Sequence, residues 1–92
     1  MKKSSQNKLY LKKRLFWFNY VPGTTMNDHI NNFNQLVTDL LNLDVIVNDE
    51  DKALMLLGSL PEKFEFLETT LLHGKAKITF SEVTAALHSY EQ

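Results

Sequence analysis

The chain has 92 residues, of which 43% are hydrophobic and 23% are charged, with a net charge of −1 and no cysteine. This size and composition predict one small globular domain or a fragment of a longer chain, with a modest core. The lack of cysteine excludes disulfides, thiolate zinc sites and cysteine nucleophiles. No leader pattern opens the chain and its apolar runs are too short to span a bilayer, so we expect a soluble, untargeted protein of the cytoplasm.

Positive charge is concentrated at the start of the chain. Six of the ten basic residues lie within the first fourteen positions, and all eleven acids follow them. Four of the six are candidates for contact with nucleic-acid phosphates, namely Lys8, Lys12, Lys13 and Arg14. Because no recognition motif flanks them, the preferred interpretation is a solvated helix start, attracted to acidic neighbours, and weak RNA contact is the alternative.

A first helix is expected from about Lys8 to Tyr20. Its second half is apolar nearly all round, so it cannot stand alone in water. Either this domain wraps it or it is the end of a preceding unit. We expect another chain to cover its aromatic residues, which are Phe16, Trp17, Phe18 and Tyr20.

The next segment carries the clearest amphipathic pattern in the chain. Pro22 and Gly23 end the first helix, and Thr25 with Asp28 predicts a capping box that begins the second. Apolar residues then recur at helical spacing, at Met26, Ile30, Phe33, Val37 and Leu40. The stretch from Leu43 to Asn48 lacks a second strand to pair with, so we expect a buried loop.

The central stretch, Asp49 to Pro61, is expected to form one short helix. Asn48 or Asp49 can cap its start, and Gly58 allows a left-handed turn at its end. Its apolar residues fall on two faces of a helical wheel. The core face holds Ala53, Leu54 and Leu57. The outward face, which we expect to mediate self-association, holds Lys52, Met55, Leu56 and Ser59.

Two further helices complete the chain. Ser59 and Glu62 predict a capping box for a fourth helix, which buries Phe64, Leu67 and Leu71 and ends at His73 and Gly74. Thr79 and Glu82 predict a third box, with Ile78 and Val83 as a hydrophobic staple. The inner face of this fifth helix is expected to hold Phe80, Val83, Leu87 and Tyr90. The predicted fold class is therefore an all-α bundle of about five short helices.

Residue patterns for catalysis and metal binding are weak. His29, His73 and His88 have no cysteine partners and no paired helical spacing, which argues against a metal site. The acids at 49–51 are explained by the dipole of the helix that they begin. Neither a glycine-rich phosphate loop nor a nucleophile elbow is present. We expect no enzyme, no cofactor and no small-molecule substrate.

Several ordered segments resemble one known family. They are KLYLKKRL (Lys8 to Leu15), His29-Ile30, Phe33-Asn34, DEDKAL (Asp49 to Leu54), LLGSLP (Leu56 to Pro61), TLLHG (Thr70 to Gly74) and EVTAAL (Glu82 to Leu87). Together they are similar to the Gag polypeptide of Copia-type LTR retrotransposons, which are abundant in plant genomes. The resemblance covers nearly the whole chain, and it rests on the ordered set rather than on any one segment.

The resemblance implies a structural protein whose capsid region assembles into the shell that packages the element's RNA. Residues 1–22 would then be a basic arm and first helix, the end of a preceding capsid unit or a swapped helix. Residues 23–92 would form a domain like the C-terminal domain of retroviral capsids. Gly23 and the helix through Phe33 would match its major homology region, and the central helix its dimerisation helix.

The sequence also departs from the family pattern. Trp17-Phe18-Asn19 replaces the usual Leu-Lys-Met, Pro22 stands where retroviral capsids have a polar Gln, and Asn32 falls about where they carry an Arg. These changes affect the polar network of the homology region. The Cys-His zinc knuckle lies outside these residues, so RNA packaging in the usual manner does not reside here.

The function predicted from the sequence is a structural self-association domain of a retrotransposon Gag capsid, which forms a homodimer or higher oligomer in a virus-like particle. One alternative is a domesticated, Gag-derived helical adaptor that binds a different protein. Another is a weakly RNA-binding helical domain. No membrane partner is expected.

Overall fold

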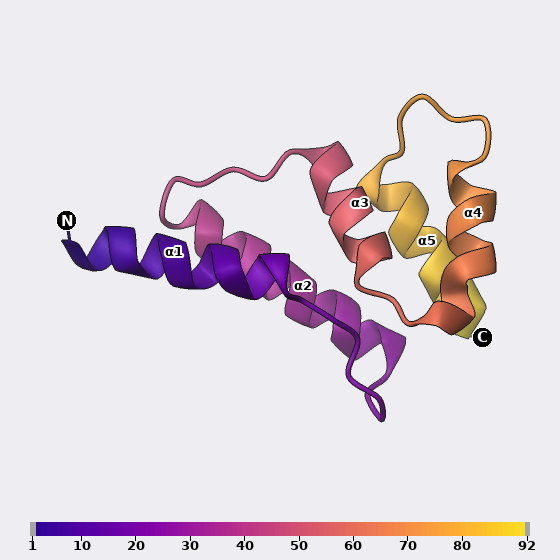
Figure 1. Cartoon of the computed structure of the whole chain (residues 1–92), viewed down its shortest axis with the longest axis horizontal. Helices are drawn as coiled ribbons and strands as arrows, with labels where there is room; N and C mark the ends of the chain where they lie inside the picture. The colour runs from indigo at the N-terminus through magenta and orange to yellow at the C-terminus, as the bar shows by residue number, and fades with distance from the viewer. Residues whose placement is uncertain (1, 92) are drawn as a thin grey trace.

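The computed structural model describes the backbone of residues 2–91 and the side chains of residues 5–90 (Figure 1). The elements are α1 (Lys2–Phe16), α2 (Met26–Leu41), α3 (Asp49–Gly58), a short 3₁₀ helix η1 (Glu62–Phe64), α4 (Glu65–Leu72) and α5 (Phe80–Glu91). No strand occurs in this described backbone. The predicted all-α fold is confirmed.

The helices form two groups (Figure 1). α1 and α2 run side by side in opposite directions, and α3 packs against α5. α2 also contacts α5, which joins the two groups, while α4 lies at the far side of the molecule from α1. The division of the chain at residue 22 stays a prediction, although Leu15 of α1 is buried in the same core as α2.

α2 is the central element of the fold, and its cap and its apolar spacing both favour a helix at this place. The Thr25 hydroxyl accepts a hydrogen bond from the Asp28 N–H at 3.0 Å, which satisfies a free donor of the first turn and confirms the predicted cap. The buried side chains of α2 are Met26, His29, Ile30, Phe33, Leu36 and Leu40. They pack against Leu15, Ala53, Leu56, Leu57, Phe64, Ile78, Val83 and Leu87.

The starts of α3 and α5 are tied together. Asn48 caps α3 by accepting from the Asp51 N–H at 2.8 Å. The Asp49 carboxylate accepts from the Phe80 N–H at 2.9 Å, and the Lys52 ammonium lies 5.0 Å from the centre of the Phe80 ring. A carboxylate at the first free N–H groups of α5 also suits the helix dipole.

The predicted capping box of the last helix is confirmed. The Thr79 hydroxyl accepts from the Glu82 N–H at 3.1 Å, and the Glu82 carboxylate accepts from the Thr79 N–H at 2.9 Å. Ile78 and Val83, the predicted staple, are both buried. Tyr90 was predicted to lie on the inner face, but it is mostly exposed. Its ring contacts the ring of Phe64, which is a core residue.

Four local expectations were wrong. α1 starts at Lys2 and ends at Phe16, four residues before Tyr20. Gly58 is helical and has no positive φ, so it makes no left-handed turn. The C-cap of α3 is the next residue, Ser59, in right-handed helical backbone. Ser59 makes no capping box, since its hydroxyl points into the core, and η1 begins at Glu62 with Pro61 as an N-cap residue that offers no side-chain cap. The loop after α2 is not buried throughout, because Ile46 is 80% exposed.

Candidate protein-contact surface

The chain leaves α1 so that alternate aromatic residues can turn inward. In extended backbone, residues two apart point to the same side. Phe18 and Tyr20 therefore both reach His29 on α2, with ring centres 4.6 Å and 5.2 Å from the imidazole. Gly23, at φ 97°, supplies the turn that leads into α2.

A buried polar pair anchors this segment. His29 Nε2 lies 2.8 Å from Ser59 Oγ, and the Ser59 hydroxyl donates to the Leu56 carbonyl at 2.6 Å. Because the single hydroxyl proton is used there, Nε2 carries the hydrogen and donates to Ser59. The Tyr20 N–H donates to the Ser59 carbonyl at 2.8 Å. Three segments of the chain therefore meet at Ser59.

This histidine–serine pair is structural and not catalytic. Both residues are only 2% exposed, so a substrate cannot reach them. The serine proton is held by a carbonyl oxygen, so the imidazole has no nucleophile to activate. Burial also lowers the pKa of His29, which keeps the ring neutral.

The predicted outward face of α3 was wrong. Leu56 and Ser59 are buried, and Leu54, which was assigned to the core, is 45% exposed. The helical wheel of a short helix with two apolar faces does not show which one is covered, and here the His29 imidazole draws Ser59 inward. Lys52 and Met55 are half-buried, so of the four predicted residues only these two have side chains accessible to a partner.

The first-helix aromatics divide into two pairs. Phe18 and Tyr20 are half-buried and pack against the core of their own chain. Phe16 and Trp17 are 74% and 72% exposed, with their rings edge to face at 5.7 Å. Two large exposed aromatics side by side are unusual outside contact surfaces.

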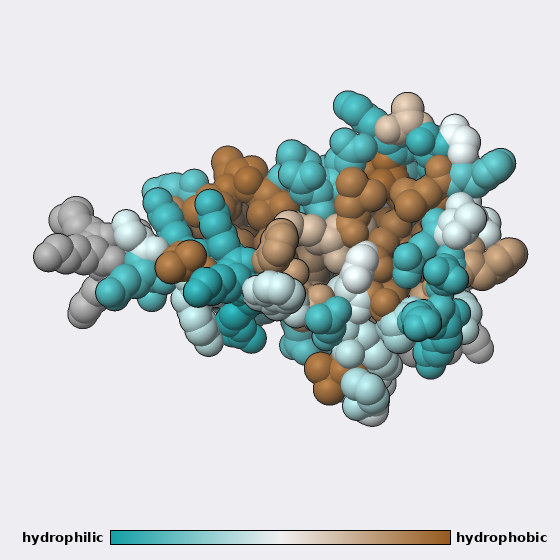
Figure 2. All heavy atoms as spheres, in the orientation of Figure 1, coloured by the Kyte–Doolittle hydropathy of each residue, from teal (hydrophilic) through white to brown (hydrophobic). Residues whose placement is uncertain are grey.

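Phe16 also borders a groove between α1, α3 and the loop after α2, which we call the α1–α3 groove. Its volume is about 290 Å³. It is lined by Lys12, Leu15, Phe16, Leu40, Val45, Ile46, Val47, Asp51 and Met55. Figure 2 shows apolar side chains gathered where α1, the end of α2 and the following loop meet, and a second group over α3 and its neighbours. The groove is thus an apolar surface with charged residues at its edge.

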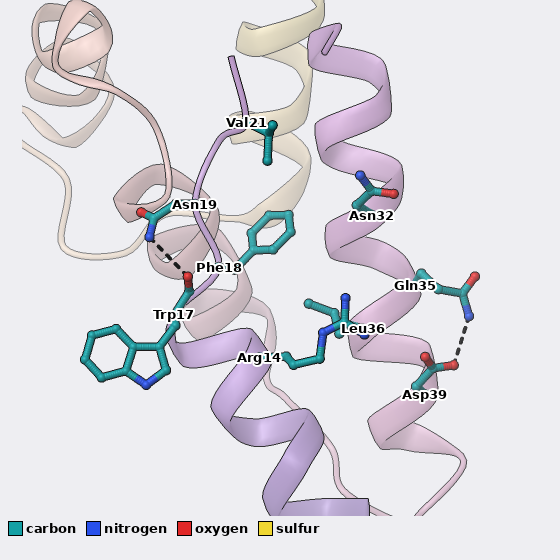
Figure 3. A pocket seen from close by; sticks show the side chains of 9 residues that line it. All are labelled: Arg14, Trp17, Phe18, Asn19, Val21, Asn32, Gln35, Leu36 and Asp39. Carbon is teal, nitrogen blue, oxygen red and sulfur yellow. Dashed lines mark hydrogen bonds between the residues drawn. The ribbon is translucent and has the colours of Figure 1, made fainter. Parts of the chain in front are cut away.

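A second hollow, of about 520 Å³, lies between the end of α1 and α2 (Figure 3). Gln35 and Asp39 are hydrogen-bonded to each other there, because the Gln35 amide donates to the Asp39 carboxylate at 2.9 Å. The Trp17 ring lies on the other side of the chain from α2 in this view. Asn32 also borders the hollow, and its amide makes no hydrogen bond to Gln35 or Asp39 in Figure 3. The hollow offers polar groups but no converging set.

The basic residues of α1 are accessible. Lys12, Lys13 and Arg14 are exposed and Lys8 is half-buried. The Arg14 guanidinium lies 5.7 Å from the centre of the Tyr10 ring. Lys2 and Lys3 are within α1, but their side chains lie outside the described set. α1 therefore presents aromatic and basic groups together.

The two most exposed of the large apolar residues were not recognised as exposed in the sequence analysis. Ile46 was assigned to a buried loop, and Phe66, 83% exposed on α4, was not singled out. Phe66 could have been found from the sequence, because it lies off the stripe formed by Phe64, Leu67 and Leu71. Nothing local distinguishes Ile46 from Val45 and Val47.

No group of three or more His, Cys, Asp or Glu side chains converges as a metal site in the part of the chain that the structure describes. His29 is in the core, while His73 and His88 are exposed. Within residues 2–91, none of the helices is both long and apolar enough to cross a membrane.

Comparison with known proteins gives one family. Residues 1–92 match the family described as gag-polypeptide of LTR copia-type. Over 87 residues the chain is 49% identical to the retrovirus-related Pol polyprotein from transposon TNT 1-94 of Nicotiana tabacum. That match covers 95% of this chain and 7% of the polyprotein, so the chain spans a small part of its relative. No solved structure matches the chain.

The matching family is not a family of enzymes. The family match extends over all of the segments on which the resemblance was based, from Lys8 to Leu87. The chain belongs to the gag-polypeptide family of copia-type LTR retrotransposons.

Proposed function

We propose that this chain is a self-association domain of a retrotransposon Gag capsid and contributes to the shell of a virus-like particle. The observation that carries the proposal is the apolar surface around the α1–α3 groove. Phe16 and Ile46 line the groove, Trp17 follows Phe16 in the chain, and each of the three is more than 70% exposed. Water contact of this much apolar area is unfavourable, and contact with another chain relieves it.

A protein partner suits this surface better than a small ligand. Small-molecule sites are enclosed and combine apolar walls with converging polar groups. Here the apolar residues stand at the rim, where a second surface can meet them. In a gag-family chain the simplest such partner is a second copy, and an adaptor that binds a different protein is the alternative.

The test is the mass of the chain in solution against its concentration, measured by sedimentation. We expect reversible association, with Trp17 emission shifting to the blue as its ring becomes covered. Phe16→Ser combined with Ile46→Ser should weaken association, since both side chains are exposed and their loss leaves the core intact. The matched control is Leu41→Ser, because Leu41 is 53% exposed but lines neither the groove nor the hollow. A strict monomer at every concentration would overturn the proposal.

Weak RNA contact is the second candidate, and the exposed Lys12, Lys13 and Arg14 favour it. Phosphate contacts release counterions, so affinity should fall steeply between about 50 and 200 mM salt. Replacing these three residues by Gln should flatten the slope. Tight, sequence-selective binding in a gel-shift titration would point to a nucleic-acid function instead of a shell.

A further inference from the structure

Two exposed surfaces of the molecule carry opposite charge around an aromatic centre. The first, which we call the α1 face, consists of Leu9, Tyr10, Lys12, Lys13, Arg14, Phe16 and Trp17, all exposed. The second, the α4 face, consists of Glu62, Glu65, Phe66 and Thr69, also all exposed. One helical surface is thus basic and aromatic, and the other has two glutamates near Phe66, with the exposed Lys63 beside them over the Phe64 ring.

Within residues 5–90, whose side chains the structure describes, the charges of the two faces form no salt bridge. Among the described residues the salt bridge that forms joins Lys75 to Glu82, away from both faces. On α4, burial and, to a smaller extent, repulsion from the nearby Glu65 carboxylate raise the pKa of Glu68. A cation brought to this helix would relieve that repulsion.

One molecule cannot bring its own two faces together. α1 lies at the left of Figure 1 and α4 at the right, with α3 and α5 between them. The long axis of the molecule measures 43 Å. Each face is therefore open to a neighbour.

We propose that the α1 face of one copy binds the α4 face of a second copy. Phe66 would lie beside Phe16 at the α1–α3 groove, and Glu62 and Glu65 would meet Lys12 and Lys13. The inference rests on the proposed self-association, and it specifies which surfaces meet. Charge complementarity sets the pairing, while the buried aromatics supply the affinity.

A contact between two different faces is heterologous. Repeated from copy to copy, such a contact closes into a ring or grows as an open helix, whereas a contact of one face with itself stops at a dimer. RNA could satisfy the α1 face alone, but its phosphates would not bind the acidic α4 face, and Phe66 would stay in water. A second copy accounts for both faces.

The experiment uses two variants of the whole chain. The α1 variant is Lys13→Gln with Phe16→Ser, and the α4 variant is Glu65→Gln with Phe66→Ser. All four side chains are exposed, so circular dichroism should show unchanged helix content. Leu41→Ser is again the control. By sedimentation, each variant alone should associate more than about tenfold more weakly than the parent, as expected when a central aromatic anchor is lost.

Mixing the variants is the decisive step. The α1 variant still has an intact α4 face, and the α4 variant an intact α1 face, so the mixture should form 1:1 complexes and no larger species. Raising the salt concentration should weaken these complexes, because their charges lie at the rim.

The outcomes separate the two proposals. A parent chain that is monomeric throughout contradicts self-association itself. A parent that associates while the mixture gives no 1:1 complex overturns the pairing of the two faces and leaves self-association standing. An α1 variant that associates normally but no longer binds a single-stranded RNA oligonucleotide would assign the α1 face to nucleic acid, and this also overturns the pairing.

Discussion

α2 and α4 are both helices with apolar residues at helical spacing, yet they have opposite places in the fold. α2 has a side-chain cap and buries residues along its whole length, whereas α4 has no side-chain cap and no fully buried residue. Phe33 of α2 is 0% exposed and Phe66 of α4 is 83% exposed. The comparison shows that α2 organises the core, while α4 is free to present its outer side to a partner.

The largest expected effect is on the core of α2. Phe33→Ala removes a side chain that touches the Phe18 and Phe80 rings. We expect a loss of about 3–5 kcal/mol in the free energy of unfolding, against a typical total of about 5–15 kcal/mol. Urea unfolding followed by circular dichroism measures it. A loss below about 1 kcal/mol would mean that α2 is not the organising helix.

The second effect is a pH dependence at His29. Burial lowers its pKa from the ordinary value of 6.5, so below pH 6.5 the unfolded chain takes up a proton that the folded chain excludes. Stability should therefore fall as the pH decreases from 6.5 through the folded pKa, and this contribution should level off below it. Urea midpoints of the parent and His29→Gln should differ in slope in this range. His88→Gln, which replaces an exposed histidine, is the matched control variant.

A smaller effect is expected at the helix starts. Thr25→Ala removes the cap of α2 and should cost about 1 kcal/mol. On α4, Thr69→Ala removes a hydroxyl that donates to the Glu65 carbonyl within the same helix, and it should change stability by less than about 0.5 kcal/mol. Equal losses in thermal unfolding would erase the contrast between the two helices.

The smallest expected effect is at Phe66. Phe66→Ala should leave the free energy of unfolding within about 0.5 kcal/mol of the parent. The reason is that Phe66 is 83% exposed, so its ring makes little contact with its own chain. Chemical denaturation of a dilute sample, where association is negligible, measures it. A large loss would show that α4 is part of the core after all.

The sequence predicted the helices whose local signals agree. Thr25 and Thr79 are strong caps, and each is followed by apolar residues at regular spacing, so the starts of α2 and α5 were predicted correctly. The all-α class follows from the same patterns. Where the cap residues and the apolar spacing indicated the same helix, the sequence alone was sufficient to predict it.

The candidate site was predicted less well, because long-range contacts decide it. Leu54 and Leu56 are equivalent by composition, and only the position of α2 and α5 determines that Leu56 is inside. The end of α1 depends on the attraction of Phe18 and Tyr20 to His29, which lies in another helix. Phe16 and Trp17 were predicted to contact another chain. Both are exposed, and their contact with a partner is still a prediction.

The bond between His29 and Ser59 has a consequence for the order of events during synthesis. The two residues are 30 positions apart. A ribosome makes the chain from the N-terminus, so α1 and α2 emerge before the residue that satisfies the His29 imidazole. Until residue 59 has emerged, the His29 imidazole lacks the hydroxyl that it meets in the folded chain. This buried polar contact can therefore form only after the whole of α3 has been made.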